Sequence, residues 1–203
     1  MPPENGTANP NCKYPDLKED LLETIDNPDK AYLLGWIASD GTIRKGTVDI
    51  TVQRSDRKLL EKLASLFSRS LPVTERKEGT QVGFTVNRQK TVQDACRHLK
   101  IEPGPKSYTV QFPELPDHLV WHFLRGLFDG DGSVRNPHTT PTLDCSIATS
   151  SVGMQDALMQ VTAEFSPRRE KDKIMWQGVN ALDFMGRLYD GADLFLLRKR
   201  GLF

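Results

Sequence analysis

Two apolar runs stand out in the pattern of hydrophobic and polar positions along the chain. Residues 33–41 read LLGWIASDG, and residues 124–132 read LRGLFDGDG. In both, an almost continuous apolar stretch stops at an aspartate in the eighth position and a glycine in the ninth. A segment that is apolar on nearly all sides is typical of a buried helix. We therefore expect two buried helices, each with a carboxylate at its C-terminal end.

Small residues occur four positions apart within both runs, Gly35 with Ser39 and Gly126 with Gly130. Residues four apart lie on the same face of a helix, and small side chains on that face let two backbones approach closely. We expect the two helices to pack against each other along these faces. That packing would bring the two aspartates together at one end of the pair.

The ends of the predicted helices carry their own signals. Asn27 is a suitable N-cap, and Pro28 fits the first helical position, where a missing N–H is tolerated. We expect Gly41 and Gly132 to end the two helices in a left-handed conformation, which glycine adopts at low cost.

Period-two alternation follows the first run. In residues 47–53 valine and isoleucine alternate strictly with polar residues, which is the pattern of a half-buried strand. The rest of the pattern predicts, in order, a helix over 55–67, a hairpin over 71–86, a helix over 90–99, a helix over 117–130, a hairpin with its turn at 136–141 and its return strand at 142–149, a helix around 154–165, a basic hairpin over 167–179 and a helix near 181–190. The same order of elements therefore occurs twice.

This order predicts an α+β protein built from a duplicated αββαββα unit with pseudo-two-fold symmetry. Two antiparallel sheets would form a saddle, with the paired central helices behind them and polar strand faces left open. We divide the chain into a tail with a short acidic helix at 1–26, a first half-domain at 27–112 and a second half-domain at 113–203. We expect the short helix, at residues 15–26, to cover the core.

Charge and composition narrow the function only slightly. The chain has 27 basic and 27 acidic residues and a net charge of zero, which is unusual for a nucleic-acid-binding protein. Its bases nevertheless gather in the predicted hairpin at 168–173 and in the tail at 198–200. The distribution of charge therefore leaves nucleic-acid binding open.

The three cysteines are odd in number and show no metal-binding spacing, which favours a reducing compartment without disulfides or zinc. No apolar run is long enough to span a membrane. The polar N-terminus also lacks the pattern of a secretory signal. We expect an intracellular protein without a membrane partner.

The candidate chemistry lies at the two helix ends. A helix C-terminus is partly negative, and two nearby carboxylates repel each other, so Asp40 and Asp131 require compensating cations. Mg²⁺ held by carboxylates, waters and substrate phosphates would provide them. Metal-assisted hydrolysis of a phosphodiester follows as a hypothesis.

The two runs resemble the paired motifs of the LAGLIDADG homing endonucleases, in their single-chain form with two motifs. The resemblance covers residues 27–203. It implies a monomer that binds a long asymmetric site in double-stranded DNA and cuts both strands, leaving short 3′ overhangs. The expected cofactor is Mg²⁺ or Mn²⁺, and Ca²⁺ would bind without supporting cleavage.

The resemblance also assigns metal ligands. The eighth residues of the motifs, Asp40 and Asp131, would bind the metal together with backbone near Ser39 and Gly130. The sixth position is not a ligand in the family. Ala38 therefore departs from the common aspartate there without loss of a ligand, whereas the second motif keeps an aspartate at this position.

Further catalytic residues follow from the same resemblance. Lys106 and Lys199 match the lysines that follow the second hairpin and helix of each half in the family, and their separation is close to that of the motifs. Gln53 matches a polar residue that orders the attacking water. Thr149 fits best as its counterpart in the second half.

Open strand faces of this kind fit the major groove of DNA, where polar side chains reach base edges and phosphates. The nominated DNA-binding residues are Thr42, Arg44, Lys45, Thr47, Thr51, Gln53, Arg76, Lys77, Gln81, Ser133, Arg135, Asn136, His138, Thr140, Thr149, Arg168, Arg169, Lys171, Lys173 and Gln177.

Two functions remain in view. The first is a free-standing, intron-encoded endonuclease, and the second is a non-cutting DNA-binding regulator or an intron RNA maturase on the same scaffold. Because both motif acids are present, the sequence favours cutting.

Overall fold

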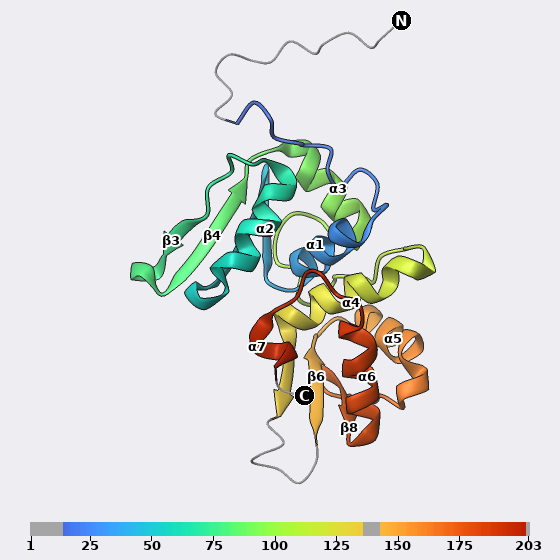
Figure 1. Cartoon of the computed structure of the whole chain (residues 1–203). Helices are drawn as coiled ribbons and strands as arrows, with labels where there is room; N and C mark the ends of the chain where they lie inside the picture. The colour runs from blue at the N-terminus through green and yellow to red at the C-terminus, as the bar shows by residue number, and fades with distance from the viewer. Residues whose placement is uncertain (1–13, 136–142, 202–203) are drawn as a thin grey trace, which may run out of the picture.

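The computed structural model describes residues 14–135 and 143–201 as two similar halves (Figure 1). The first half contains α1 (Pro28–Ala38), β1 (Gly41–Arg44), β2 (Thr47–Gln53), η1 (Arg54–Asp56), α2 (Arg57–Phe67), β3 (Thr74–Arg76), η2 (Lys77–Gly79), β4 (Gln81–Val86) and α3 (Gln89–Leu99). The second contains α4 (Asp117–Asp131), β5 (Gly132–Arg135), β6 (Asp144–Ala148), α5 (Val152–Val161), η3 (Ala163–Phe165), β7 (Arg168–Glu170), β8 (Lys173–Gln177), α6 (Val179–Tyr189) and α7 (Leu197–Arg200).

The two sheets have the same topology. Their strand orders are β1-β2-β4-β3 and β5-β6-β8-β7, and all paired strands are antiparallel. Each sheet contributes apolar side chains to a core under its helices, with Phe67 against Phe84 in one half and Trp176 stacked on Phe184 in the other. The predicted α+β fold with a duplicated unit is confirmed.

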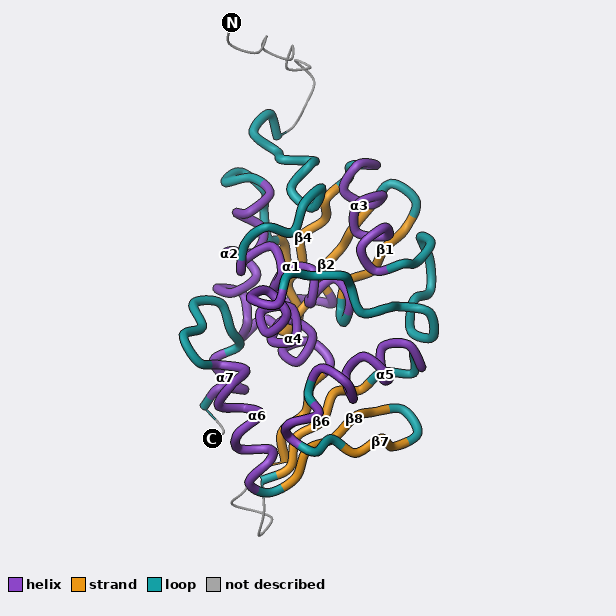
Figure 2. Tube along the Cα trace, turned by 90° about the vertical axis from the view of Figure 1, so that its right-hand side faces the viewer, coloured by secondary structure: helices purple, strands orange, loops and turns teal. Residues whose placement is uncertain are grey.

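The helices α1 and α4 lie side by side at the centre of the molecule in both views (Figures 1 and 2). A Cβ on Gly35 would lie 2.3 Å from the Phe123 carbonyl oxygen, and one on Gly126 would lie 2.1 Å from the Tyr32 carbonyl oxygen. Only hydrogen fits at these positions. The predicted close packing of the helices through their small residues is therefore confirmed.

The N-terminal end of α1 follows the sequence signal. The Asn27 side chain accepts a hydrogen bond from the Lys30 amide at 3.1 Å, and Pro28 opens the helix. All residues from Ala31 to Ala38 are buried, as expected for a helix that is apolar all round.

The left-handed conformation expected at Gly41 and Gly132 is wrong. Gly41 opens β1 and Gly132 opens β5, and neither has a positive φ. The reason for glycine is steric, because a Cβ at Gly132 would lie 2.2 Å from the Phe128 carbonyl oxygen and one at Gly41 would lie 2.6 Å from that of Ile37. The chain turns sharply from helix into strand at both points.

The short acidic helix expected near 15–26 is also wrong, because this segment forms turns. Its backbone carbonyls at residues 19, 22 and 23 accept hydrogen bonds from side chains of α3. Leu22 and Ile25 are buried, so the segment does cover the core as expected. Within the described residues, no helix is long and apolar enough to cross a membrane.

Candidate active site

The two motif acids meet at adjoining helix ends. Asp40 follows the last turn of α1, and Asp131 is the last residue of α4. The Asp40 carboxylate lies 3.4 Å from the position that a Cβ on Gly130 would take, so it sits against the residue that precedes Asp131. Asp40 is exposed and Asp131 is partly buried. The arrangement expected from the two motifs is present.

The surroundings of both acids disfavour their charged forms. Burial raises the pKa of Asp131 to about 6, and the charge of Asp40 adds to that rise. Asp40 keeps an exposed surface, but the groups packed around its carboxylate remove part of its hydration, and this raises its pKa against the opposing charges of Lys199, Lys106 and Arg198. A carboxylate whose ionisation is disfavoured by burial and by a neighbouring carboxylate forms a site that favours a bound cation.

Lys106 and Lys199 occupy equivalent places at the two helix ends. The Lys106 Nζ donates to the Ser39 carbonyl at 2.5 Å, at the end of α1. The Lys199 Nζ donates to the Phe128 and Asp129 carbonyls at 2.6 and 2.7 Å, and lies 3.3 Å from the Gly130 carbonyl. Each lysine thus caps the carbonyls that a helix leaves unpaired at its C-terminus.

These lysines also face the acids. Burial lowers the pKa of Lys106, and burial lowers the pKa of Lys199 to about 8. Among the neighbouring charges, Asp131 opposes this shift most strongly at Lys106, while Lys199 is the cation that most lowers the pKa of Asp40. Each lysine therefore acts most strongly on the motif acid of the other half.

A cavity of about 240 Å³ opens beside Asp131. It is lined by Ala38, Ser39, Lys106, Ser107, Val110, Asp131, Ala148, Thr149, Ser150 and Asp172. Residues from both halves therefore contribute to one space next to a motif acid and a lysine.

Strand register identifies the counterpart of Gln53. Gly41 pairs with Ile50, and Gly132 pairs with Ile147. Gln53 lies three residues after Ile50, so its counterpart is Ser150 and not Thr149 as expected from the sequence. The Thr149 hydroxyl accepts a hydrogen bond from the Ser151 amide, and Thr149 thus belongs to the turn before α5.

Sequence reasoning missed the role of Asp129 at the sixth motif position. Its fully buried carboxylate accepts hydrogen bonds from the Tyr32 hydroxyl at 2.6 Å, the Tyr189 hydroxyl at 2.5 Å and the Leu196 amide at 2.8 Å. Burial raises its pKa, and these hydrogen bonds oppose that rise. Asp129 joins α1, α4, α6 and the segment that carries Lys199.

A buried arginine completes this polar cluster. The Arg125 guanidinium donates to the carbonyls of Leu188 and Leu194 and lies 5.4 Å from the centre of the Tyr32 ring. Arg125 is 3% exposed, and its burial lowers the pKa of the guanidinium. The signal in the sequence was a charged residue inside an otherwise apolar helix.

The donor set suits a hard divalent cation. In the described part of the chain, no group of three or more histidine, cysteine, aspartate or glutamate side chains could hold a metal ion. Two carboxylates alone leave most coordination positions to water or phosphate oxygens, which is how Mg²⁺ is usually held. The residues present therefore fit the expected metal.

A family model described as the LAGLIDADG-like domain matches residues 27–99 and 119–186. This chain belongs to the LAGLIDADG-like family. The first matched segment runs from α1 to α3, and the second runs from α4 through the second sheet into α6. The duplication is therefore shared with the family. Lys106 and Lys199 both lie outside the matched segments.

Solved structures with the same fold include three DNA complexes. I-GzeII in complex with its DNA target has a TM-score of 0.59 at 10% identity, and I-AabMI bound to uncleaved DNA has a TM-score of 0.56 at 12% identity. I-SmaMI bound to an uncleaved DNA target in the presence of calcium ions has a TM-score of 0.53 at 12% identity. Each similarity covers 87% of both chains. No curated protein sequence matches the chain.

The open face of the first LAGLIDADG-like sheet contains most residues nominated there. Thr42, Arg44, Thr47, Thr51, Gln53, Arg76 and Gln81 share the face opposite the buried valine, isoleucine and phenylalanine side chains. Lys45 lies in the turn after β1, and Lys77 lies in η2. A groove of about 460 Å³ between β1 and residues 104–107 runs from this face to Lys106.

An acid in the middle of this face was not among the nominated residues. Asp49 accepts hydrogen bonds from the Thr51 and Thr85 hydroxyls and lies 3.5 Å from an Arg76 nitrogen. This network holds Arg76 in place. It also reduces the positive charge of the face.

The second sheet places most of its nominated residues on the open face. Ser133, Arg135, Arg168, Lys173 and Gln177 share that face, and Lys171 lies in the turn between β7 and β8. The Arg168 guanidinium donates to the Gln177 side chain at 2.9 Å. Asn136, His138 and Thr140 lie outside the described residues.

Arg169 lies on the helix side of the sheet, so the expectation that it faces outward beside Arg168 is wrong. It pairs in register with the buried Ile174, and its guanidinium forms an ion pair with Asp156 of α5 on the helix side of the sheet. Successive residues of a strand point to opposite faces, so Arg168 and Arg169 cannot both face outward.

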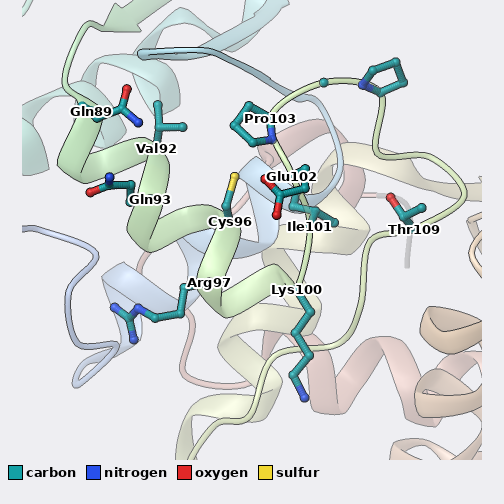
Figure 3. A pocket seen from close by; sticks show the side chains of 12 residues that line it. Gln89, Val92, Gln93, Cys96, Arg97, Lys100, Ile101, Glu102, Pro103 and Thr109 are labelled. Atoms are coloured by element: carbon teal, nitrogen blue, oxygen red, sulfur yellow. The ribbon is translucent and has the colours of Figure 1, made fainter.

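Figure 3 shows a further cavity, in the first half of the molecule. It has a volume of about 940 Å³ and opens between α3 and residues 101–109. Cys96 points from α3 toward the Ile101 segment, and neither motif acid is among the lining residues. The largest of the three cavities described here is therefore not the one beside the motif acids.

Proposed function

We propose that this chain is a site-specific homing endonuclease that makes a metal-dependent double-strand cut in a long asymmetric DNA target, leaving short 3′ overhangs. The observation that carries this proposal is the meeting of Asp40 and Asp131 at adjoining helix ends between two sheets with polar open faces. The structurally similar proteins are described as bound to DNA, which supports the same partner here.

DNA would lie across both open faces, with one half of the protein on each half of the target. Strand side chains would reach into the major groove, while phosphates would be held by the turn lysines and by arginines at the sheet edges. Because the chain carries both halves, it would act as a monomer with pseudo-two-fold symmetry. Its encoding within an intron is a prediction that rests on the family, and its place inside the cell is a prediction that rests on the cysteine pattern and the polar N-terminus.

Asp40 and Asp131 would hold Mg²⁺ or Mn²⁺ between them, and Ca²⁺ would bind without supporting cleavage. A bound divalent ion supplies Lewis-acid activation of the phosphate and of an attacking water. The carbonyls of Ser39 and Gly130 already accept lysine hydrogen bonds, and a metal contact at their second lone pairs stays a prediction.

The other residues of the site would act on charge and water. Lys106 and Lys199, fixed on the helix ends, would stabilise negative charge that develops on the phosphate. Gln53 and Ser150, at equivalent strand ends, would orient the attacking water at the two positions. These roles need both strands of DNA to pass close to the helix ends.

The first experiment is a cleavage selection on a randomised duplex library with Mg²⁺. The unmodified protein should yield one long asymmetric cut site, and Asp40→Asn and Asp131→Asn should each lower cleavage by at least about a hundredfold, because each removes a charge that holds the metal. Both variants should still bind the selected target. Asp117→Asn, at the opposite end of α4, is the matched control and should cut normally.

Other results would overturn the proposal. Enrichment of one bound sequence without any cut product would instead identify a DNA-binding regulator. Enrichment of neither, with binding to intron transcripts, would identify a maturase. Loss of binding in both aspartate variants would show that the acids act in structure or in holding DNA.

A further inference from the structure

One ion pair connects the C-terminal helix to the opposite half of the molecule. The Arg198 Nε lies 3.2 Å from Asp56 Oδ2, and Asp56 is 9% exposed at the end of η1. The Ser55 hydroxyl donates to the other carboxylate oxygen of Asp56 at 3.3 Å. Arg198 directly precedes Lys199, and Asp56 lies three residues after Gln53. Both partners are therefore next to residues of the proposed active site.

The ion pair ties Arg198 to the half of the molecule that carries Asp40, because Asp56 belongs to that half. The Arg198 side chain is 47% exposed, so its guanidinium remains accessible while the Nε is held. An arginine fixed in this way keeps N–H groups that can bind a phosphate.

The second half has no equivalent of this pair. Since Lys106 corresponds to Lys199, Pro105 occupies the position of Arg198. By the register that matches Gln53 with Ser150, Gly153 occupies the position of Asp56. Neither Pro105 nor Gly153 carries a charge, so these two positions cannot form an ion pair. Among these described positions, the additional cation is therefore present only where Arg198 meets the first half, which carries Asp40.

We propose that Arg198 binds the DNA phosphate on the Asp40 side, that Asp56 is its positioning residue, and that the two strands are consequently cut at unequal rates. This inference rests on the proposed endonuclease function and adds that one strand is cut faster than the other. Hydrolysis forms a bond from the water oxygen to phosphorus and breaks the bond to the leaving sugar oxygen. One water proton goes to that oxygen and the other is released to solvent. The additional guanidinium stabilises the charge on the phosphate during this step.

The competing explanation is that the pair only fastens the two halves together. If the ion pair has only this structural role, removing it should slow cleavage of both strands alike and lower the stability of the protein. A phosphate-binding role would slow one strand and leave the other almost unchanged. Strand-resolved kinetics therefore separate the two.

The experiment uses the full chain and its selected target, with each strand labelled separately at its 5′ end and with Mg²⁺ present. Arg198→Gln should slow one strand by about 10- to 100-fold and the other by less than about threefold. Asp56→Asn should slow the same strand by about three- to tenfold, because the arginine is retained but no longer held. Arg198→Lys, which keeps the charge and loses the fork, should fall between Arg198→Gln and the unmodified protein. Arg200→Gln, on the same helix with its guanidinium over Phe195, is the matched control and should leave both rates unchanged.

The outcomes are distinguishable. Equal slowing of both strands, with a lower Tm, would overturn the inference and leave the endonuclease proposal intact. Slowing of different strands by Arg198→Gln and Asp56→Asn would also overturn it. If Arg198→Gln does not fold, Arg198→Lys and Asp56→Asn still decide between one strand and both. Failure of the unmodified protein to cut any duplex would overturn the proposed function and this inference with it.

Discussion

The carboxyl group of Asp131 is held where its charge is disfavoured, and this has a measurable effect on stability. Because its pKa is raised to about 6, the folded protein binds more protons than the unfolded chain between about pH 4 and pH 6. Stability is therefore lost as pH rises through this window, and the full penalty applies above it. Solvent screening of the partly exposed carboxylate reduces that penalty to about 1 kcal/mol.

We therefore expect Asp131→Asn to stabilise the metal-free protein by about 1 kcal/mol at pH 7.5, with the gain vanishing near pH 4. Urea unfolding in the presence of a chelator at both pH values measures the difference. Asp183→Asn, on the exposed side of α6, serves as the control and should change neither value. A gain that persisted at pH 4 would show that the raised pKa is not its cause.

At this scale, the motif residues could be predicted and their partners could not. Asp40 and Asp131 follow from where two apolar runs stop, which is visible in the sequence itself. The partners of Asp129, by contrast, come from helices far away in sequence, and nothing local marks Tyr32 or Tyr189 as hydrogen-bond donors to it. The outward orientation expected of Arg169 was wrong because a run of basic residues does not show which of two adjacent side chains faces outward. The strand register decides this.

At the scale of elements, the contact between α1 and α4 depends on having no side chain at its crossing point. Gly126→Ala would place a methyl group 2.1 Å from the Tyr32 carbonyl oxygen, which is backbone and cannot rotate away. The helices would have to separate, and the change should cost about 3 kcal/mol or more. Urea unfolding measures this loss of stability, provided that the slope of the unfolding free energy against urea concentration is unchanged.

Gly186 in α6 provides the matched control. A Cβ there would meet nothing within 4 Å, and alanine is favoured over glycine inside a helix. Gly186→Ala should therefore stabilise the protein by about 0.5–1 kcal/mol. Equal effects of the two substitutions would mean that helix propensity, and not the close approach of α1 and α4, governs both sites.

Most elements follow from hydrophobic period, and the exceptions have identifiable causes. The strict alternation over 47–53 became β2 with the same bounds, since one face of that strand is buried. Residues 15–26 have helical spacing of apolar residues, yet side chains of α3 take up their carbonyls and leave turns. Tertiary contacts override local pattern in such a short segment.

At the scale of the whole molecule, a net charge of zero conceals an uneven distribution. Arg168, Lys171 and Lys173 lie on or beside the open face of the second sheet, whereas Arg169 is paired with Asp156 behind it. Charge on the open face would reach DNA, and charge behind the sheet would not. Comparing the charges of the open face with that of Arg169 behind the sheet therefore tests which face binds DNA.

Charge reversal of Arg168, Lys171 and Lys173 together should weaken binding of the selected target at least about a hundredfold at 0.1 M salt. It should also reduce the slope of log affinity against log salt by up to about 0.9 for each phosphate that the protein no longer neutralises. Lys173 contributes less than the others because Glu170 lies 2.9 Å from its ammonium. Arg169→Gln, which removes a charge from the opposite face, should leave both affinity and slope within error. An unchanged slope in the triple variant would place the DNA on another surface, because counterion release does not depend on which bases are read.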